Sequence, residues 1–128
     1  MHQPSLAGCR ILIIEDEYFL GDDLANALRS LGAHVIGPVP DLDEAMAEGH
    51  DGFDVAIVDI NLRGTSAYPI ADKLMRVGKP FIFATGYSAD YLPDRFHHIH
   101  RCEKPYDLEN ITTSLGALCI AHQSRVAA

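Results

Sequence analysis

Several short apolar segments of this 128-residue chain stop abruptly at an acidic or polar residue, and this pattern restricts the fold more than any other feature. The segment at residues 9–14 is apolar apart from Arg10 and ends at Glu15 and Asp16, and the segment at 53–58 is apolar apart from Asp54 and ends at Asp59. Near-continuous apolar runs of this length are typical of strands buried on both faces of a parallel sheet. Because parallel strands end at one edge of their sheet, the residues that follow them are expected to converge there.

Between these segments the apolar spacing changes to that of helices. After Tyr18, leucines recur on one helical stripe until Gly32, which is placed to end that helix. We expect strands at 9–14, 34–39, 53–58, 80–84 and 98–103, and a helix after each of them, the least regular being 88–96, which Pro93 interrupts. Asp41 and Asp107 are placed to cap helices, and Pro69 suits a first helical turn. The alternation predicts an α/β fold with a five-stranded parallel sheet covered on both faces.

The charge and the cysteines restrict partners and compartment. Eighteen acidic against ten basic residues give a net charge of -8, which disfavours nucleic acid and anionic membranes as partners. No apolar stretch reaches the length of a membrane span. Cys9, Cys102 and Cys119 form no CxxC pair, so we expect reduced thiols and a cytoplasmic protein. One domain is expected at 10–122, with tails at 1–9 and 123–128.

The residues expected at the carboxyl edge of the sheet indicate phosphoryl chemistry. Two carboxylates about 4 Å apart repel by roughly 4 kcal/mol at an effective dielectric constant near 20, so Glu15, Asp16 and Asp59 need a cation. Hard oxygen ligands suit Mg²⁺. Asp59 beside this metal is a candidate nucleophile toward phosphorus. Lys104 would offer positive charge and Thr85 a hydroxyl donor to phosphoryl oxygens.

Three segments resemble the receiver domains of two-component response regulators. Ile11–Leu–Ile–Ile–Glu–Asp–Glu17 is similar to the first strand and acid pair of that family, and Asp54–Val–Ala–Ile–Val–Asp59 to the strand that carries its phosphorylated aspartate. Glu103–Lys104–Pro105 resembles the family's Lys-Pro signature. The resemblance extends from about Arg10 to Ala121, almost the whole chain.

The resemblance implies a flavodoxin-like (βα)5 fold with strand order 2-1-3-4-5 and assigns a role to each site residue. Asp59 is then both phosphoacceptor and metal ligand, and Asn61 lends its backbone carbonyl to Mg²⁺. By the same resemblance, Glu15 and Asp16 are the acids that hold the metal, and Thr85 and Lys104 are the family's hydroxyl and lysine. The resemblance also implies a cis peptide bond before Pro105. Phe83–Ala–Thr–Gly–Tyr87, with Asn61-Leu62 and Tyr68-Pro69, further resembles the FATGUY subgroup of receivers.

Two positions depart from the family pattern. Arg101 stands three residues before Lys104, where most receivers have the aromatic residue of their switch. Arg63 and Gly64 stand where a proline is common, which predicts a longer and more mobile loop. We hypothesise that Tyr87, or movement of the loop at 63–67, takes over the signalling role.

Each site residue also has an ordinary structural interpretation. Asp59 alone could cap a helix, Glu15 to Glu17 could favour a helix N-terminus, Thr85 could satisfy a backbone group, and Lys104 could be a surface lysine. His98, His100 and Cys102 alternate along an expected strand and are a weak candidate for zinc. No GxxxxGK[ST] or GxGxxG phosphate loop is present in the sequence.

The resulting hypothesis is a single-domain response regulator. It would accept a phosphoryl group on Asp59 from a sensor histidine kinase or a histidine phosphotransferase, and catalyse only its own phosphorylation and dephosphorylation. With no output domain expected after residue 121, signalling would pass by contact with a downstream protein target. The alternatives are a phosphate sink, which drains a kinase and needs no target, and an interaction module that works without metal.

Overall fold

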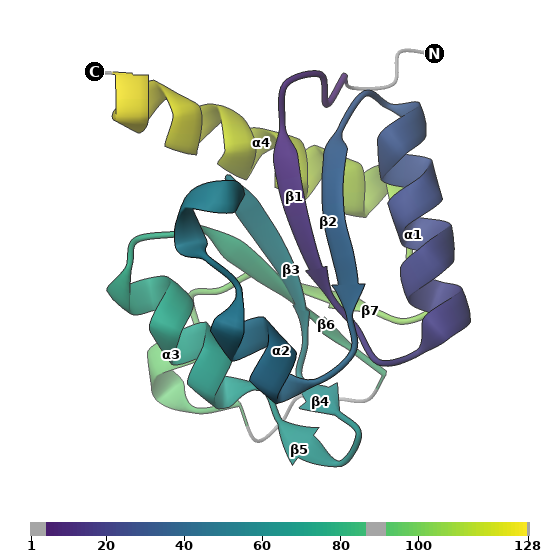
Figure 1. The fold of residues 1–128 in the computed structure, drawn as a ribbon, viewed down its shortest axis with the longest axis vertical. Coiled ribbons are helices and arrows are strands. Elements are labelled where there is room, and N and C mark those ends of the chain that lie inside the picture. The colour runs from purple at the N-terminus through teal and green to yellow at the C-terminus, as the bar shows by residue number, and fades with distance from the viewer. Residues whose placement is uncertain (1–4, 87–91, 128) are drawn as a thin grey trace.

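The computed structural model describes residues 5–86 and 92–127 and has a five-stranded parallel sheet at its centre. The strands are β1 (Arg10–Ile14), β2 (His34–Val39), β3 (Val55–Asp59), β6 (Phe81–Thr85) and β7 (Arg101–Glu103). Their order is β2-β1-β3-β6-β7, and every neighbouring pair is parallel (Figure 1). Counting only these strands, this is the predicted order 2-1-3-4-5, so the flavodoxin-like arrangement is confirmed.

Helices cover both faces of the sheet (Figure 1). On one face lie α1 (Tyr18–Ser30) and α4 (Leu108–Ala127), and on the other lie α2 (Leu42–Ala47) and α3 (Tyr68–Arg76). The alternation of side chains along β1 divides the core accordingly: Ile11 and Ile13 pack toward α1 and α4, and Leu12 and Ile14 toward α2 and α3. Burial on both faces explains why this strand is apolar from Ile11 to Ile14.

The helix ends follow the residues that predicted them. The Asp41 carboxylate accepts a hydrogen bond of 2.8 Å from the backbone N–H of Glu44 and so caps α2. Pro69 lies in the first turn of α3, where its missing N–H costs nothing. After α1 the chain reverses through Gly32, whose φ of 100° is unfavourable for a residue with a Cβ.

The segment before β7 differs from the prediction. The expected strand at 98–103 is shortened to Arg101–Glu103, and the expected helix at 88–96 is represented, within the described part of the chain, by the 3-10 turn Asp94–Phe96. Phe96 is fully buried, with its ring centroid 5.4 Å from that of Tyr68 and 5.5 Å from that of Phe83. One buried aromatic side chain thus covers this part of the sheet, a packing role that helical periodicity does not reveal.

A small hairpin follows β3, where a longer and more mobile loop than usual in the family was predicted. Its strands are β4 (Asn61–Leu62) and β5 (Thr65–Ser66), which pair antiparallel and are closed by Arg63 and Gly64. Leu62 is buried in the core on the α2 and α3 side and anchors the hairpin. The hairpin was not predicted, because strands of two residues are too short to show alternation in the sequence; the mobility of this segment stays a prediction.

Two of the cysteines are paired, against the expectation of reduced thiols. Cys9 and Cys119 form a disulfide between the start of β1 and α4, with their Cα atoms 6.1 Å apart, while Cys102 is free and buried. Their separation of 110 residues in the sequence hides a proximity that only the fold creates. None of the helices in the described residues combines the length and the apolar character needed to span a membrane.

Defined structure extends beyond the expected domain on both sides. Leu6, in the predicted tail at 1–9, is buried in the core with α1 and α4, and α4 continues to Ala127. The domain boundaries themselves stay a prediction.

Candidate functional site

The predicted site residues lie together at the carboxyl edge of the sheet. Glu15 and Asp16 directly follow β1, Asp59 is the last residue of β3, and Glu17 precedes α1. Each of these four side chains offers a carboxylate oxygen, and the four oxygens lie within 4.8 Å of one another. Glu15 and Asp59 are buried, at 2% and 5% exposure, so their charges are poorly screened by solvent.

Lys104, which directly follows β7, contacts three of these acids. Its ammonium nitrogen lies 2.8 Å from Asp59 Oδ2, 2.8 Å from Glu17 Oε1 and 2.9 Å from the carboxylate of Glu15. The Lys104 side chain is only 9% exposed. A single ammonium therefore provides all three of its donors to one cluster of carboxylates.

Hydrogen bonds from backbone N–H groups position these residues. The Lys104 N–H donates to the Thr85 carbonyl oxygen at 2.8 Å, which continues the β6–β7 pairing and places Lys104 beside the end of β6. The Asn61 N–H donates to Asp59 Oδ1 at 3.1 Å. The Lys104–Pro105 peptide bond is cis, as the family resemblance implied.

Crowding of the carboxylates changes their proton affinity. Burial, together with a hydrogen bond to Glu15 and repulsion from it, raises the pKa of Asp59 to about 8, although Lys104 acts in the opposite direction. In the metal-free site at neutral pH, Asp59 therefore retains its proton most of the time.

The surrounding groups also shift the pKa values of Lys104 and Asp16. Burial alone would lower the pKa of Lys104, but its hydrogen bonds to Asp59, Glu17 and Glu15 raise it, so the side chain stays charged. Burial acts to raise the pKa of Asp16, yet the backbone N–H of Arg63 and the neighbouring acids outweigh burial and lower it. Asp16 is thus held ionised.

The donor set fits a hard divalent cation. With all four carboxylates ionised, the cluster and Lys104 together carry a formal charge of -3. Oxygen donors on one rigid edge, open on the side of the half-exposed Asp16 and Glu17, leave room for the waters that Mg²⁺ retains. The fit rests on the chemistry of the donors and not on a bound ion.

Two site residues, Glu17 and Tyr106, were not predicted from the sequence. Glu17 was interpreted only as a charge near a helix N-terminus, but it also pairs with Lys104. The Tyr106 hydroxyl donates to Glu15 Oε1, and burial and this contact raise the pKa of Tyr106. The signals were adjacency alone: Glu17 extends the acid pair, and Tyr106 comes two residues after Lys104.

The remaining predicted residues have defined positions. Thr85 is the last residue of β6 and is buried, and Arg101 is exposed at the start of β7. Tyr87, proposed for the signalling role, lies outside the described residues. The zinc candidates do not form a site, because His98 and His100 are exposed and precede β7 while Cys102 is buried. Among the described residues, the acidic cluster is the one group with several potential metal ligands close together.

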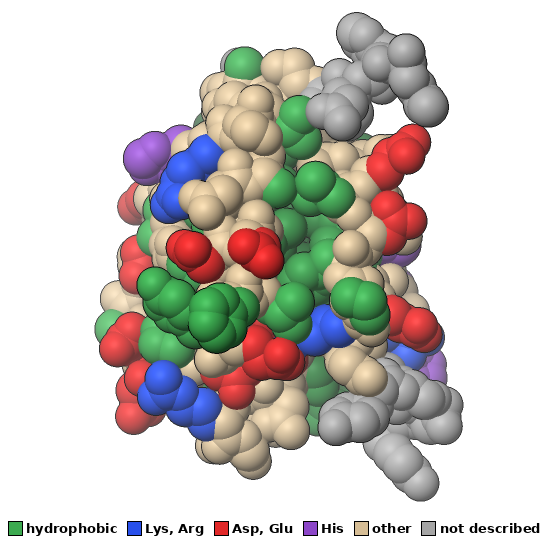
Figure 2. Space-filling model, turned by 90° about the vertical axis from the view of Figure 1, so that its right-hand side faces the viewer, with side chains coloured by type: hydrophobic (Ala, Val, Ile, Leu, Met, Phe, Trp, Pro, Cys, Tyr) green, Lys and Arg blue, Asp and Glu red, His purple; other side chains and the backbone are tan. Residues whose placement is uncertain are grey.

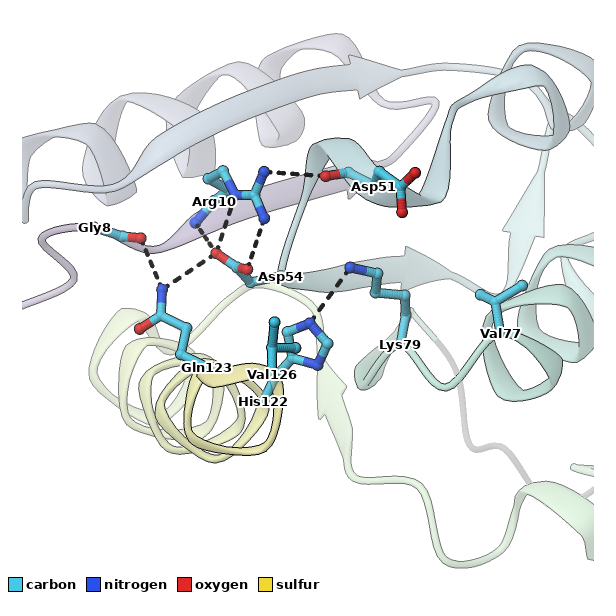
Figure 3. A pocket seen from close by; sticks show the side chains of 9 residues that line it. All are labelled: Gly8, Arg10, Asp51, Asp54, Val77, Lys79, His122, Gln123 and Val126. Carbon is cyan, nitrogen blue, oxygen red and sulfur yellow. Dashed lines mark hydrogen bonds and ion pairs between the residues drawn. The ribbon is translucent and has the colours of Figure 1, made fainter. Parts of the chain in front are cut away.

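A cleft of about 650 Å³ lies at the opposite, amino-terminal edge of the sheet (Figure 3). There the Asp54 carboxylate accepts hydrogen bonds from the backbone and the guanidinium of Arg10, at 3.0 to 3.3 Å. The Lys79 ammonium donates to the Phe53 carbonyl oxygen at 2.6 Å and lies 3.4 Å from Nε2 of the buried His122. These contacts join α4 to the start of the strands.

An ammonium has only donors, so the contact with Lys79 requires Nε2 of His122 to accept and Nδ1 to carry the proton. Within the described part of the chain, this Nδ1 is buried without a hydrogen-bond partner. Burial and the Lys79 charge both lower the pKa of His122.

The surface around α1 is acidic and partly apolar (Figure 2). Acidic side chains are spread over this face beside a protruding hydrophobic group, with few basic side chains between them. Tyr18 and Phe19, the first residues of α1, are 74% and 81% exposed and meet edge to face with centroids 5.7 Å apart. This aromatic pair directly follows the acidic cluster in the chain.

Sequence comparison finds a two-component response regulator and a transcriptional regulatory protein. The two-component response regulator PhoP of Pseudomonas aeruginosa is 36% identical over 117 residues, which are 85% of this chain and 51% of PhoP. The chain thus spans about half the length of the curated relatives it matches. No protein-family model matches the chain.

Comparison with solved structures finds receiver domains that this chain covers over nearly their whole length. SdrG from Sphingomonas melonis Fr1 is 36% identical, with a TM-score of 0.75 over 90% of this chain and 98% of SdrG. The signal receiver domain of a modulated diguanylate cyclase from Desulfovibrio desulfuricans G20 is 25% identical, with a TM-score of 0.79 over 91% of this chain and 98% of that domain.

Proposed function

Because this chain belongs to the family of response regulator receiver domains, we propose that Asp59 accepts a phosphoryl group in a reaction that requires Mg²⁺. The observation that carries the proposal is the placement of the Asp59 carboxylate at the end of β3, among three further carboxylates and one ammonium. Within the described residues, Asp59 is the aspartate that combines burial, contact with a lysine and a place among several potential metal ligands.

The reaction follows from the chemistry of these groups. A carboxylate oxygen of Asp59 forms a bond to the phosphorus of a phosphohistidine while the bond between phosphorus and imidazole nitrogen breaks, and the imidazole leaves with the electron pair. Lys104 provides positive charge for the phosphoryl oxygens, and Thr85 at the end of the neighbouring β6 provides a hydroxyl. Hydrolysis of the acyl phosphate returns Asp59 to its starting state.

The metal ligands are proposed to be the carboxylates of Glu15, Asp16 and Asp59 and the backbone carbonyl of Asn61. Mg²⁺ bound there would neutralise charge on the transferring phosphoryl group. Lys104 would be released from part of the cluster once a divalent cation balances the carboxylates, and so become available to the phosphoryl oxygens.

The phosphodonor is proposed to be a sensor histidine kinase or a histidine phosphotransferase. The exposed Tyr18 and Phe19 next to the acidic cluster offer an apolar contact for such a protein at the approach to Asp59. The relative SdrG has a BeF3-activated conformation, which supports activation by a phosphoryl group in this protein as well. Membership of the FATGUY subgroup is part of the proposal and rests on residues 83–87.

The output is proposed to be contact with a downstream protein. A phosphate sink without such a target is the alternative, and the lifetime of the phosphoryl group separates them. A signalling protein has to keep its phosphoryl group long enough to bind a target, whereas a sink is favoured by rapid loss and by the absence of any partner that prefers the phosphorylated form.

Incubation with acetyl phosphate tests the proposal. Intact-mass measurement should find one added phosphoryl group in the presence of Mg²⁺ and none after chelation of the metal. Asp59→Asn should abolish the gain. Asp54→Asn is the matched control, because Asp54 is also buried and directly precedes the strand that ends at Asp59; it should gain the group as the unsubstituted protein does. An unchanged mass with Mg²⁺, or an equal gain in Asp59→Asn, contradicts the proposal.

A further inference from the structure

The hairpin after β3 closes through a backbone that is unfavourable for one of its residues. Arg63 has a φ of 52° and Gly64 a φ of 80°, the combination of a type I′ turn. Glycine adopts this conformation freely, but a residue with a Cβ does so only when surrounding contacts hold it there. Arg63 therefore needs partners that fix the turn.

Two side chains supply these contacts, and one belongs to the acidic cluster. The Arg63 N–H donates to Asp16 Oδ2 at 2.8 Å, across 47 residues of sequence. The Asn61 side-chain oxygen accepts from the Gly64 N–H at 2.9 Å. The Asn61 side chain thus closes the turn with a hydrogen bond inside the hairpin, and Asp16 accepts a second hydrogen bond from the closed turn.

The two hydrogen bonds also restrict what Asn61 and Asp16 can offer a cation. The Asn61 side-chain oxygen is occupied by Gly64, which leaves its backbone carbonyl for the metal. One oxygen of Asp16 is occupied by Arg63, which fixes the rotation of the carboxylate and leaves the second oxygen for the metal. The Asn61 N–H donates to Asp59 Oδ1, so the same residue also contacts the phosphoacceptor.

We propose that the turn at 61–64 is a positioning device for Asp16, set by the Asn61 side chain, and that its closure and Mg²⁺ binding stabilise each other. This inference rests on the proposed function, since it assumes that Mg²⁺ binds the acidic cluster. Linkage makes the effect reciprocal: a turn that improves metal affinity is itself held closed by the metal.

The test is titration of the metal-free protein with Mg²⁺ by calorimetry. Asn61→Ala keeps the backbone carbonyl and loses the side-chain oxygen that accepts from the Gly64 N–H. The affinity of this variant for Mg²⁺ should fall about 10-fold, as is usual when a partner of a metal ligand is removed. Asn61→Ser restores a weaker acceptor and should recover part of the loss. Ser66→Ala is the matched control, because Ser66 is paired with Asn61 in the same hairpin but its hydroxyl accepts from the Tyr68 N–H, outside the turn.

Hydrogen exchange of the Arg63 amide gives a second measurement on the same proteins. Mg²⁺ should slow this exchange in the unsubstituted protein and have a smaller effect in Asn61→Ala. Equal Mg²⁺ affinity in the unsubstituted protein and Asn61→Ala overturns the positioning role and leaves the proposed function intact. The same conclusion follows if Ser66→Ala loses as much Mg²⁺ affinity as Asn61→Ala. Absence of Mg²⁺ binding by the unsubstituted protein overturns both proposals.

Discussion

The ammonium of Lys104 lies 2.8 Å from Asp59 Oδ2 and joins two strand ends that are 45 residues apart in the sequence. Because the same nitrogen also contacts Glu15 and Glu17, Lys104 compensates the charge of a buried carboxylate cluster before any metal enters. The site is therefore organised by this lysine, and its removal separates the roles of ammonium and metal.

Lys104→Met should leave the carboxylates uncompensated and lower the metal-free free energy of unfolding by about 3 kcal/mol. Mg²⁺ should restore much of this stability and should bind at least as tightly as in the unsubstituted protein, since no ammonium competes for the carboxylates. Urea unfolding with and without Mg²⁺ measures both effects. Lys79→Met is the control: its ammonium contacts a carbonyl oxygen and an imidazole, so any loss of stability should be independent of Mg²⁺. An equal response of the two variants to Mg²⁺ contradicts this account of Lys104.

Asp59→Asn should stabilise the metal-free protein, and more so as the pH rises. The folded protein holds the Asp59 pKa at about 8, above its unfolded value near 4, so between these values the folded state binds more protons. Stability of the unsubstituted protein is then lost as the pH rises through this window, and asparagine removes the loss. Urea unfolding between about pH 5 and about pH 8 measures the difference between the two proteins. A difference that stays constant with pH shows that Asp59 is not protonated in the metal-free site.

The central strands β1, β3 and β6 were predictable from the sequence because they are buried on both faces and end at or just before a polar residue, whereas the strand order was implied by the resemblance to receiver domains. Glu15, Asp16, Asp59, Thr85 and Lys104 follow from the rule that parallel strands share a carboxyl edge. Other features depend on contacts between distant residues. The Arg63 N–H donates to Asp16, 47 residues away, and Phe96 packs against Phe83 from a 3-10 turn, so neither arrangement is visible in the local sequence. The Cys9–Cys119 pair arises in the same way.

Asp54→Asn should destabilise the protein by about 2 kcal/mol at neutral pH, because the Arg10 guanidinium loses a charged, nearly buried acceptor. Burial opposes ionisation of Asp54, but the hydrogen bonds from Arg10 lower its pKa overall. Its contribution is therefore present above the unfolded value near 4 and is lost as the pH falls through the lower folded pKa.

Urea unfolding at neutral and acidic pH measures the Asp54 effect. Asp72→Asn is the matched control, because the Asp72–Arg95 pair has similar distances but side chains 40% and 52% exposed, and it should change stability by less than about 1 kcal/mol. Equal effects of the two substitutions contradict the importance assigned to burial at Asp54.

His122→Leu should reduce the loss of stability on acidification from about pH 7 to about pH 5. Burial and Lys79 lower the folded pKa of His122 below the unfolded value near 6.5, so in this window the unfolded state binds more protons and stability falls with falling pH. Leucine removes the titrating group and the unpaired Nδ1. Thermal unfolding across this pH range measures the slope, and an unchanged slope in His122→Leu contradicts the assignment.

The central claim is that phosphorus becomes attached to the carboxylate of Asp59. Borohydride reduces an aspartyl phosphate to homoserine, so treatment of the protein after acetyl phosphate and Mg²⁺ converts the modified residue into a product that tandem mass spectrometry locates in the chain. The account predicts homoserine at position 59, dependent on Mg²⁺ and absent from Asp59→Asn. Homoserine at another aspartate, or none despite a phosphorylated intact mass, would contradict it.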